Sequence, residues 1–204
     1  MESFSKVFEG ASLKDAIEVV GPKAHEARRA DFKTFCEVGL IICFKMLDTK
    51  EVWTIEFDSK RYSFERGEAV DFPLVTIEGK AANWPIFRAH LLELADLLEG
   101  QKERAKGRKW TRALHDVFES FDGSIDLSFV DDTYPHPIDI RIILNNYEDS
   151  FFDKFSATIP VALLFDVARG QVSPRSAAKT LKIGGSLGFA IELGGFFATH
   201  FEKT

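Results

Sequence analysis

The spacing of apolar and polar positions changes several times along the chain, and each change marks a new type of element. Residues 1–36 have a helical pattern, in which a capping box at Ser12–Asp15 begins an apolar run that ends at Gly21-Pro22. Between residues 40 and 77, apolar and polar positions alternate in runs separated by short polar links. This alternation predicts an antiparallel meander of strands with one solvated face.

The middle of the chain returns to helical spacing. Asn83 is placed to cap an amphipathic helix. The apolar stripe of that helix consists of Phe87, Leu91, Leu94 and Leu98. The basic, glycine-bounded segment 100–109 is interpreted as a solvated linker. A third helix is expected over 110–121, and two further alternating strands follow it over 124–129 and 138–144.

The last quarter of the chain, residues 155–201, is expected to contain two strands and three helices. In chain order the sequence predicts a strand at Ala157–Val161, a helix at Leu163–Gly170, a helix at Ser173–Lys179, a strand at Leu181–Ile183, a turn at Gly184-Gly185 and a helix at Ser186–Phe197. Glu192 is the only charged residue of the final helix. One side of this helix should therefore pack on a sheet, while another side needs a second apolar partner, either protein or ligand.

The order of elements repeats, at about residues 24–100 and again at about 108–204. In each copy the strand before a helix carries a threonine between apolar residues. We therefore expect an N-terminal helical segment at 1–23, a first half at 24–100 and a second half at 101–204. A single continuous domain is the alternative. The predicted fold class is α+β: a curved antiparallel sheet, or two related sheets, covered by helices on one face.

Phenylalanine is unusually frequent, with 20 residues against 3 tyrosines and 3 tryptophans. Because a phenylalanine ring has no polar group, it is normally buried against apolar surface. Two interpretations stay open: an aromatic-rich core, or a core with apolar wall left over for a ligand. The net charge of −6 argues against a nucleic-acid-binding surface.

The cysteines and histidines do not support a disulfide-stabilised fold or a metal site. The two cysteines, Cys36 and Cys43, are too few for a disulfide scaffold and are not spaced like a zinc site. The five histidines are likewise not paired at ligand spacing. We expect no metal and no cofactor. The sequence has no signal peptide and no apolar run long enough to span a membrane, so a cytoplasmic location is expected.

Residues 184–188 match the G-x-S-x-G motif of hydrolase nucleophiles and lie between a predicted strand and a predicted helix. Such a nucleophile needs an acid and a histidine from later strands. The acids and the histidine that follow are Glu192, Glu202 and His200, and they lie on or directly after the predicted final helix rather than on later strands. We therefore interpret Ser186 as the N-cap of the final helix and expect no enzymatic activity.

About 40 residues of the last quarter resemble the sterol carrier protein type 2 family of lipid-transfer domains. The matching segments are Ala157–Ile159, Leu163–Gly170, Ser173–Ala177 and Leu181–Leu193. In these places the family has a strand, a short helix ending in glycine, a helix start containing proline, and a Leu-Lys-Ile-x-Gly strand that leads into an apolar helix. The strands over 124–144 fit the family more loosely, and the first half lacks a recognisable closing strand and terminal helix.

The resemblance implies a hydrophobic tunnel between sheet and helices that takes sterols, fatty acyl chains or phospholipids. We therefore expect non-catalytic binding or transfer of a lipid or acyl chain, in an apolar cavity of several hundred Å³ beneath the final helix. The residues expected to line it are Trp53, Ile55, Phe57, Phe165, Leu187, Phe189, Ile191 and Phe196. Transient membrane contact and homo-oligomerisation are both compatible with the sequence.

The alternative function is a structural or protein-interaction module with a filled core and no ligand. Its docking patch would consist of exposed parts of Phe189, Phe196, Phe197 and Phe201.

Overall fold

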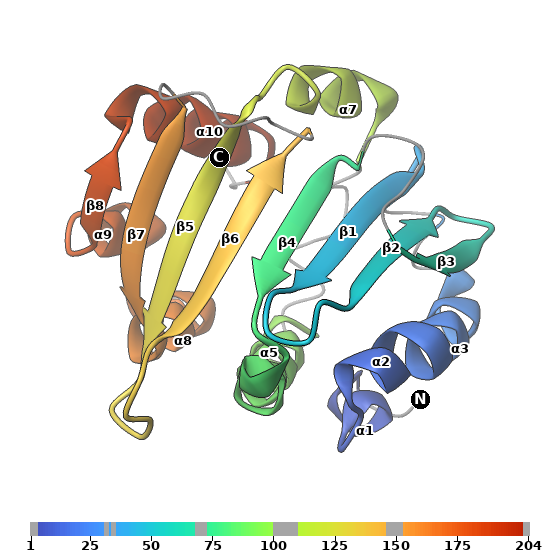
Figure 1. Cartoon of the computed structure of the whole chain (residues 1–204). Coiled ribbons are helices and arrows are strands. Elements are labelled where there is room, and N and C mark those ends of the chain that lie inside the picture. The colour runs from blue at the N-terminus through green and yellow to red at the C-terminus, as the bar shows by residue number, and fades with distance from the viewer. Residues whose placement is uncertain are drawn as a thin grey trace.

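The structure is a computed structural model, and it describes residues 4–30, 33, 36–67, 73–99, 110–145 and 153–201. The predicted linker at 100–109 lies outside these residues. The fold is α+β, with one open sheet of eight strands in the order β3-β2-β1-β4-β6-β5-β7-β8 (Figure 1). The strands are β1 Leu40–Met46, β2 Val52–Phe57, β3 Tyr62–Arg66, β4 Val75–Gly79, β5 Gly123–Val130, β6 Ile138–Leu144, β7 Lys154–Pro160 and β8 Lys182–Gly185.

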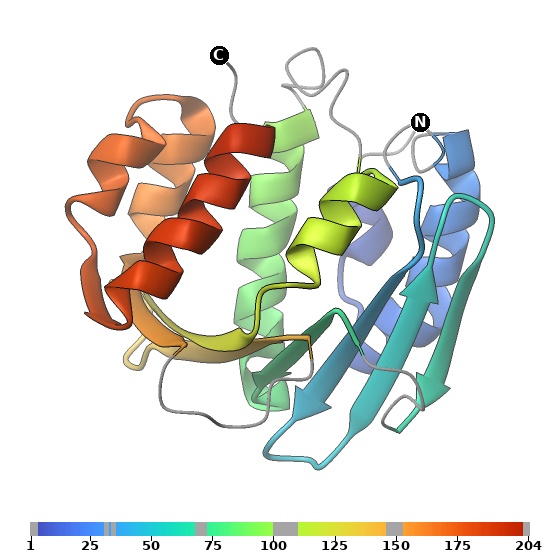
Figure 2. The same cartoon turned by 90° about the horizontal axis from the view of Figure 1, so that it is seen from above.

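The helices gather on one face of this sheet, with α5 in the middle (Figure 2). They are α1 Phe4–Phe8, α2 Leu13–Asp15, the π-helical η1 Ala16–Val20, α3 Gly21–Ala27, the 3₁₀-helical η2 Ala81–Asn83, α5 Trp84–Glu99, α7 Arg112–Phe118, α8 Val161–Arg169, α9 Pro174–Ala178 and α10 Leu187–Phe201. Helix α5 packs laterally between α1 and α8.

The sheet is mixed, so the expectation of a purely antiparallel sheet is wrong. Strand β4 pairs with β1 in parallel, and β7 pairs with β5 in parallel, while the other neighbours are antiparallel. Alternation in the sequence indicates which residues share a face of a strand, but it does not indicate which strands become neighbours. Here the more apolar β4 takes a central position and leaves the polar end of β3 at the sheet edge.

Both halves of the chain use the same pairing scheme. In each half the first strand is antiparallel to the second and parallel to the strand that leads into a helix, which is β4 before α5 and β7 before α8. Among the described residues, β3 has no counterpart in the second half, and β8 and α10 have none in the first. The antiparallel pair of β4 and β6 joins the two halves into one continuous sheet.

The buried apolar residues form two clusters under the helices. The first lies between the N-terminal helices and β1–β2, and consists of Leu13, Ile17, Met46, Trp53 and Ile55. The second lies under α7 and α10, and its aromatic members are Trp110, Phe118, Phe189 and Phe196, with Phe121 packed against them. The rings of Phe118 and Phe196 are 5.7 Å apart between centroids, and those of Phe121 and Phe196 are 5.5 Å apart. With Phe155, which also packs against it, this cluster contains five of the 20 phenylalanines.

Candidate functional site

The two halves of the sheet separate at one end, between β4 and β6. Their ladder ends at the pair Glu78 and Arg141. Beyond that pair, Gly79 continues alongside Met46 of β1, whereas Ile140 continues alongside Leu127 of β5. The two strands therefore diverge into a wedge at the lower edge of the sheet in Figure 1.

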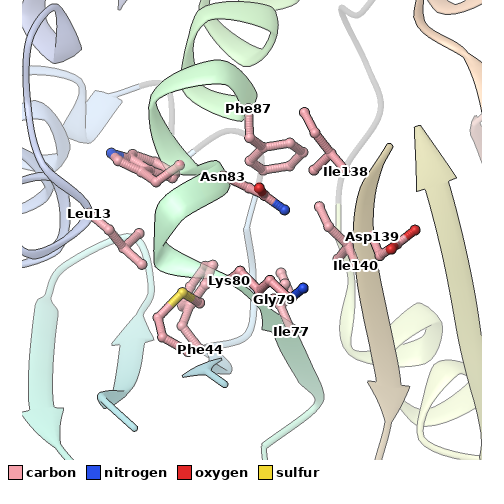
Figure 3. Close-up of a pocket in the computed structure, with 12 residues that line it drawn as sticks. Leu13, Phe44, Ile77, Gly79, Lys80, Asn83, Phe87, Ile138, Asp139 and Ile140 are labelled. Carbon is pink, nitrogen blue, oxygen red and sulfur yellow. The ribbon is translucent and has the colours of Figure 1, made fainter. Parts of the chain in front are cut away.

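An apolar pocket lies in this wedge on the helix-covered face, beneath the first turns of α5. Its free volume is about 40 Å³. In Figure 3, Phe87 on α5 faces Ile138 and Ile140 on β6, and Asn83 lies between them. The complete lining is Leu13, Phe44, Met46, Ile77, Gly79, Lys80, Asn83, Trp84, Phe87, Ile138, Asp139 and Ile140. Apart from Lys80, Asn83 and Asp139, these side chains have no strongly polar group, so the pocket suits an apolar guest.

The free volume is small compared with that of a typical ligand site. It is close to the roughly 30 Å³ that one water molecule occupies in the liquid, whereas drug-sized ligands occupy about 300–1,000 Å³. The expected cavity of several hundred Å³ is thus not present in this pocket as it stands. The pocket holds the end of a chain at most, unless side chains such as Phe87 move.

Polar contacts fix the start of α5 over the pocket. The carboxylate of Asp48, in the turn after β1, accepts hydrogen bonds from the backbone N–H groups of Ala81 at 2.7 Å and Ala82 at 3.1 Å. These bonds hold the pKa of Asp48 below its usual value. The indole N–H of Trp84 donates to the carbonyl of Ala11 at 2.9 Å. The expectation that Asn83 caps this helix is wrong, because Asn83 lies inside the 3₁₀ turn that precedes α5. Asp48 instead binds the free backbone N–H groups at the start of that turn.

The middle of α5 contacts the turn between β5 and β6 through a histidine and an aspartate. His90 Nε2 lies 3.2 Å from Asp131 Oδ2, at an angle outside hydrogen-bonding geometry. The other carboxylate oxygen of Asp131 accepts from the hydroxyl of Thr133 at 2.6 Å and from its N–H at 2.8 Å. The hydrogen bonds from Thr133 lower the pKa of Asp131 most, and the nearby His90 lowers it further. The Asp131 carboxylate thus stabilises the β5–β6 turn next to α5.

A larger concavity of about 460 Å³ lies on the face of the sheet away from the helices, and we call it the polar concavity because its lining has more polar groups than that of the apolar pocket. Apolar atoms still make up most of its surface. Its lining is Leu47, Glu78, Gly79, Lys80, Asp126, Leu127, Ser128, Asp139, Ile140, Arg141, Ser156, Ala157 and Thr158. Arg141 donates to both oxygens of Asp126, at 2.7 and 3.3 Å, and Ser128 donates to Asp139 at 2.8 Å. This surface is therefore rich in hydroxyl and carboxylate groups.

The eight residues expected to line a lipid pocket do not come together. Trp53 and Ile55 are buried in the first cluster with Phe57 against it, and Phe189 and Phe196 are buried in the second. Phe165 is buried on α8, with its ring centroid 6.0 Å from that of His90. Leu187 and Ile191 are 61% and 64% exposed. None of the eight lines either concavity described above.

The space beneath α10 is occupied by the aromatic cluster of Trp110, Phe118 and Phe196. Neighbouring rings of this cluster lie 5.5 Å apart between the centroids of Trp110 and Phe118, and 6.4 Å apart between those of Trp110 and Phe196. The pocket at the wedge uses Phe44, Phe87 and Ile138 instead. In the sequence these residues have the same alternating or helical spacing as other apolar positions of the core, so nothing local marked them as pocket residues.

The G-x-S-x-G segment is a helix start, as predicted. The hydroxyl of Ser186 accepts from the N–H of Phe189 at 3.2 Å, and the N–H of Ser186 donates to the carbonyl of Lys154 at 2.6 Å. Gly185 has φ +86°, and a Cβ there would lie 2.3 Å from the Lys154 carbonyl oxygen, so only glycine fits. The side chain of His200 lies outside what the structure describes.

The other reactive side chains of the described ranges are buried or scattered. Cys36 and Cys43 are both buried, and burial raises the pKa of the Cys36 thiol to about 11. The described residues contain no group of three or more histidine, cysteine or acidic side chains that could hold a metal ion. Within the described part of the chain, no helix combines the length and apolar character needed to cross a membrane.

A scan against protein-family models finds no matching family, and searches of curated proteins and of solved structures find no match. The resemblance to the sterol carrier protein type 2 family therefore stays a prediction from the sequence.

Proposed function

We propose that this protein binds the apolar part of a lipid or acyl-chain ligand without catalysis. The binding place is the wedge between β4 and β6, under α5, rather than the space under α10. The observation that carries the proposal is the apolar pocket formed where the β4–β6 ladder ends, with Phe87, Ile138 and Ile140 as its walls.

The energetics of chain burial favour such a ligand once the pocket has opened. Each buried methylene contributes about 0.8 kcal/mol, so ten contribute about 8 kcal/mol. The association cost begins at about 4 kcal/mol. Opening requires movement of Phe87, whose ring meets that of Phe129 at a centroid distance of 6.3 Å and is half-buried. Because the Phe87 ring is only half-buried, its rotation would open the pocket.

Displacement of a fluorescent acyl probe tests the proposal, together with native mass spectrometry and organic extraction of the purified protein. Ile140→Phe fills the pocket, whereas Ile125→Phe adds the same volume in the aromatic cluster. The two isoleucines are 9% and 8% exposed, so each enlargement should cost a similar 1–3 kcal/mol of stability. We expect at least tenfold weaker probe binding for I140F and little change for I125F. Absence of both extracted lipid and probe binding in the wild type would overturn the proposal.

The alternative function, a protein-interaction module, is supported by the outer side of α10. Leu187, Ile191 and Phe197 on this helix are 61%, 64% and 43% exposed, and Ile183 on β8 is 44% exposed. Phe189 and Phe196, which we expected in a docking patch, are buried instead, and the side chain of Phe201 lies outside the description. Light scattering of the wild type and of Ile191→Glu tests it: association through this face predicts a larger wild-type particle that the charge dissociates.

A further inference from the structure

We propose that the ligand is a single-chain amphiphile with an uncharged head rich in hydroxyl groups, bound across the sheet. Its chain lies in the apolar pocket under α5, and its head lies in the polar concavity on the opposite face. This inference rests on the proposed function and adds the head-group chemistry to it.

The two concavities meet at the wedge. Gly79, Lys80, Asp139 and Ile140 line both of them, one on the helix-covered face and the other on the open face. In a continuous sheet the hydrogen-bonded backbones of neighbouring strands keep the two faces apart. Here the β4–β6 pairing has already ended at Glu78 and Arg141, so the strands are no longer joined at this place. The wedge is therefore the place where one ligand reaches both faces.

The missing side chain of Gly79 leaves space between β4 and β6 at this place. A Cβ built on Gly79 would meet Asp139 O at 4.0 Å, which is an ordinary van der Waals contact. The backbone of Gly79 does not have positive φ, so its conformation does not require glycine. A branched side chain at this position would fit the strand and fill the gap between β4 and β6.

The charges of the polar concavity favour an uncharged head. Its lining has three carboxylates, on Glu78, Asp126 and Asp139, against the two cations Lys80 and Arg141. Arg141 already binds Asp126 through two hydrogen bonds. An anionic head would therefore meet excess negative charge. A quaternary ammonium head has no hydrogen-bond donor, so it could not donate to the carboxylates and hydroxyls of the lining.

Hydroxyl groups match the remaining chemistry. In the β5–β7 register Ser156 lies beside Asp126, and Thr158 lies beside Ser128, so three hydroxyls and a carboxylate gather in this part of the concavity. Such a surface can donate to and accept from each hydroxyl of a sugar or glycerol. The volume of about 460 Å³ lies in the range of small-molecule sites.

Isothermal titration with three ligands of equal chain length tests the inference: octyl glucoside, octanoate and octyltrimethylammonium, each below the concentration at which it forms micelles. We expect octyl glucoside to bind at least tenfold more tightly than either charged ligand. Ser156→Ala, which removes one hydroxyl from the head site, should weaken octyl glucoside about 2- to 10-fold and leave octanoate unchanged. Ser63→Ala, on the distant strand β3, is the matched control and should change neither.

Gly79→Val supplies a second readout, because filling the wedge should weaken octyl glucoside at least tenfold while glucose binding stays unchanged. If octyl glucoside binds no better than octanoate and S156A has no effect, the head-group inference fails while the chain-binding proposal stands. If neither the acyl probe nor any of the three ligands binds, both fail together.

Discussion

Two adjacent phenylalanines on α10 give the sharpest test of the packing beneath that helix. Phe196 is 6% exposed and contacts the rings of Phe118 and Phe121, whereas Phe197 is 43% exposed. Removing a buried phenylalanine ring costs about 3–5 kcal/mol through lost burial and the cavity left behind. For a chain of this size that corresponds to a fall in Tm of about 6–20 °C. Phe197→Ala should cost about 1 kcal/mol.

Urea unfolding followed by tryptophan fluorescence measures both values, because Trp110 lies in the same cluster. The helix propensity of the new residue is the same in the two variants, so the difference between them reports on burial alone. Similar losses in Phe196→Ala and Phe197→Ala would refute this reasoning. It would mean that the inner side of α10 is not packed against the aromatic cluster, and that room for a ligand exists there after all.

Three further results are expected. Ser186→Ala should lower the free energy of unfolding by about 1 kcal/mol, measured by urea unfolding, because it removes the cap of α10; an unchanged midpoint would contradict the cap. Hydrogen bonds from Arg66, and to a smaller extent from Trp53, lower the pKa of Glu18 in the folded protein. Glu18 therefore stabilises the folded protein at pH values above its unfolded pKa, and this stabilisation is lost as the pH falls through its lowered folded pKa. Glu18→Gln should therefore flatten the loss of thermal stability between about pH 5 and pH 3, and an unchanged slope would count against this ion pair. A thiol reagent at pH 8 should label neither Cys36 nor Cys43 in the native protein and both in urea, since both are buried; rapid native labelling would contradict their burial.

Local features could be predicted from the sequence because they depend on neighbouring residues. The serine caps at Ser12 and Ser186 are confirmed, since each hydroxyl accepts from the N–H three residues later. Ser173 makes the same contact at the start of α9. The alternating runs also became strands, with small shifts at their ends. These signals act over one turn or one strand, where propensity and capping decide the conformation.

Features that depend on distant partners could not be predicted in the same way. Asp48 and Ala81 are 33 residues apart, so nothing local indicates that a turn carboxylate caps the segment leading into α5. The apolar pocket exists because two strands from different halves stop pairing at Glu78 and Arg141, which is a property of their register. The sequence indicated an apolar final helix, but not that Phe189 and Phe196 face inward while Leu187 faces solvent.

Methyl NMR of isoleucine-labelled protein tests the central claim most directly. Ile77, Ile138 and Ile140 line the pocket under α5, while Ile183 and Ile191 lie exposed on β8 and α10. Titration with monomeric octyl glucoside or octanoate should shift the first three methyl signals in a saturable way and leave the last two in place. Shifts confined to Ile183 and Ile191 would mean that the chain only adheres to α10, and would contradict a binding pocket at the wedge.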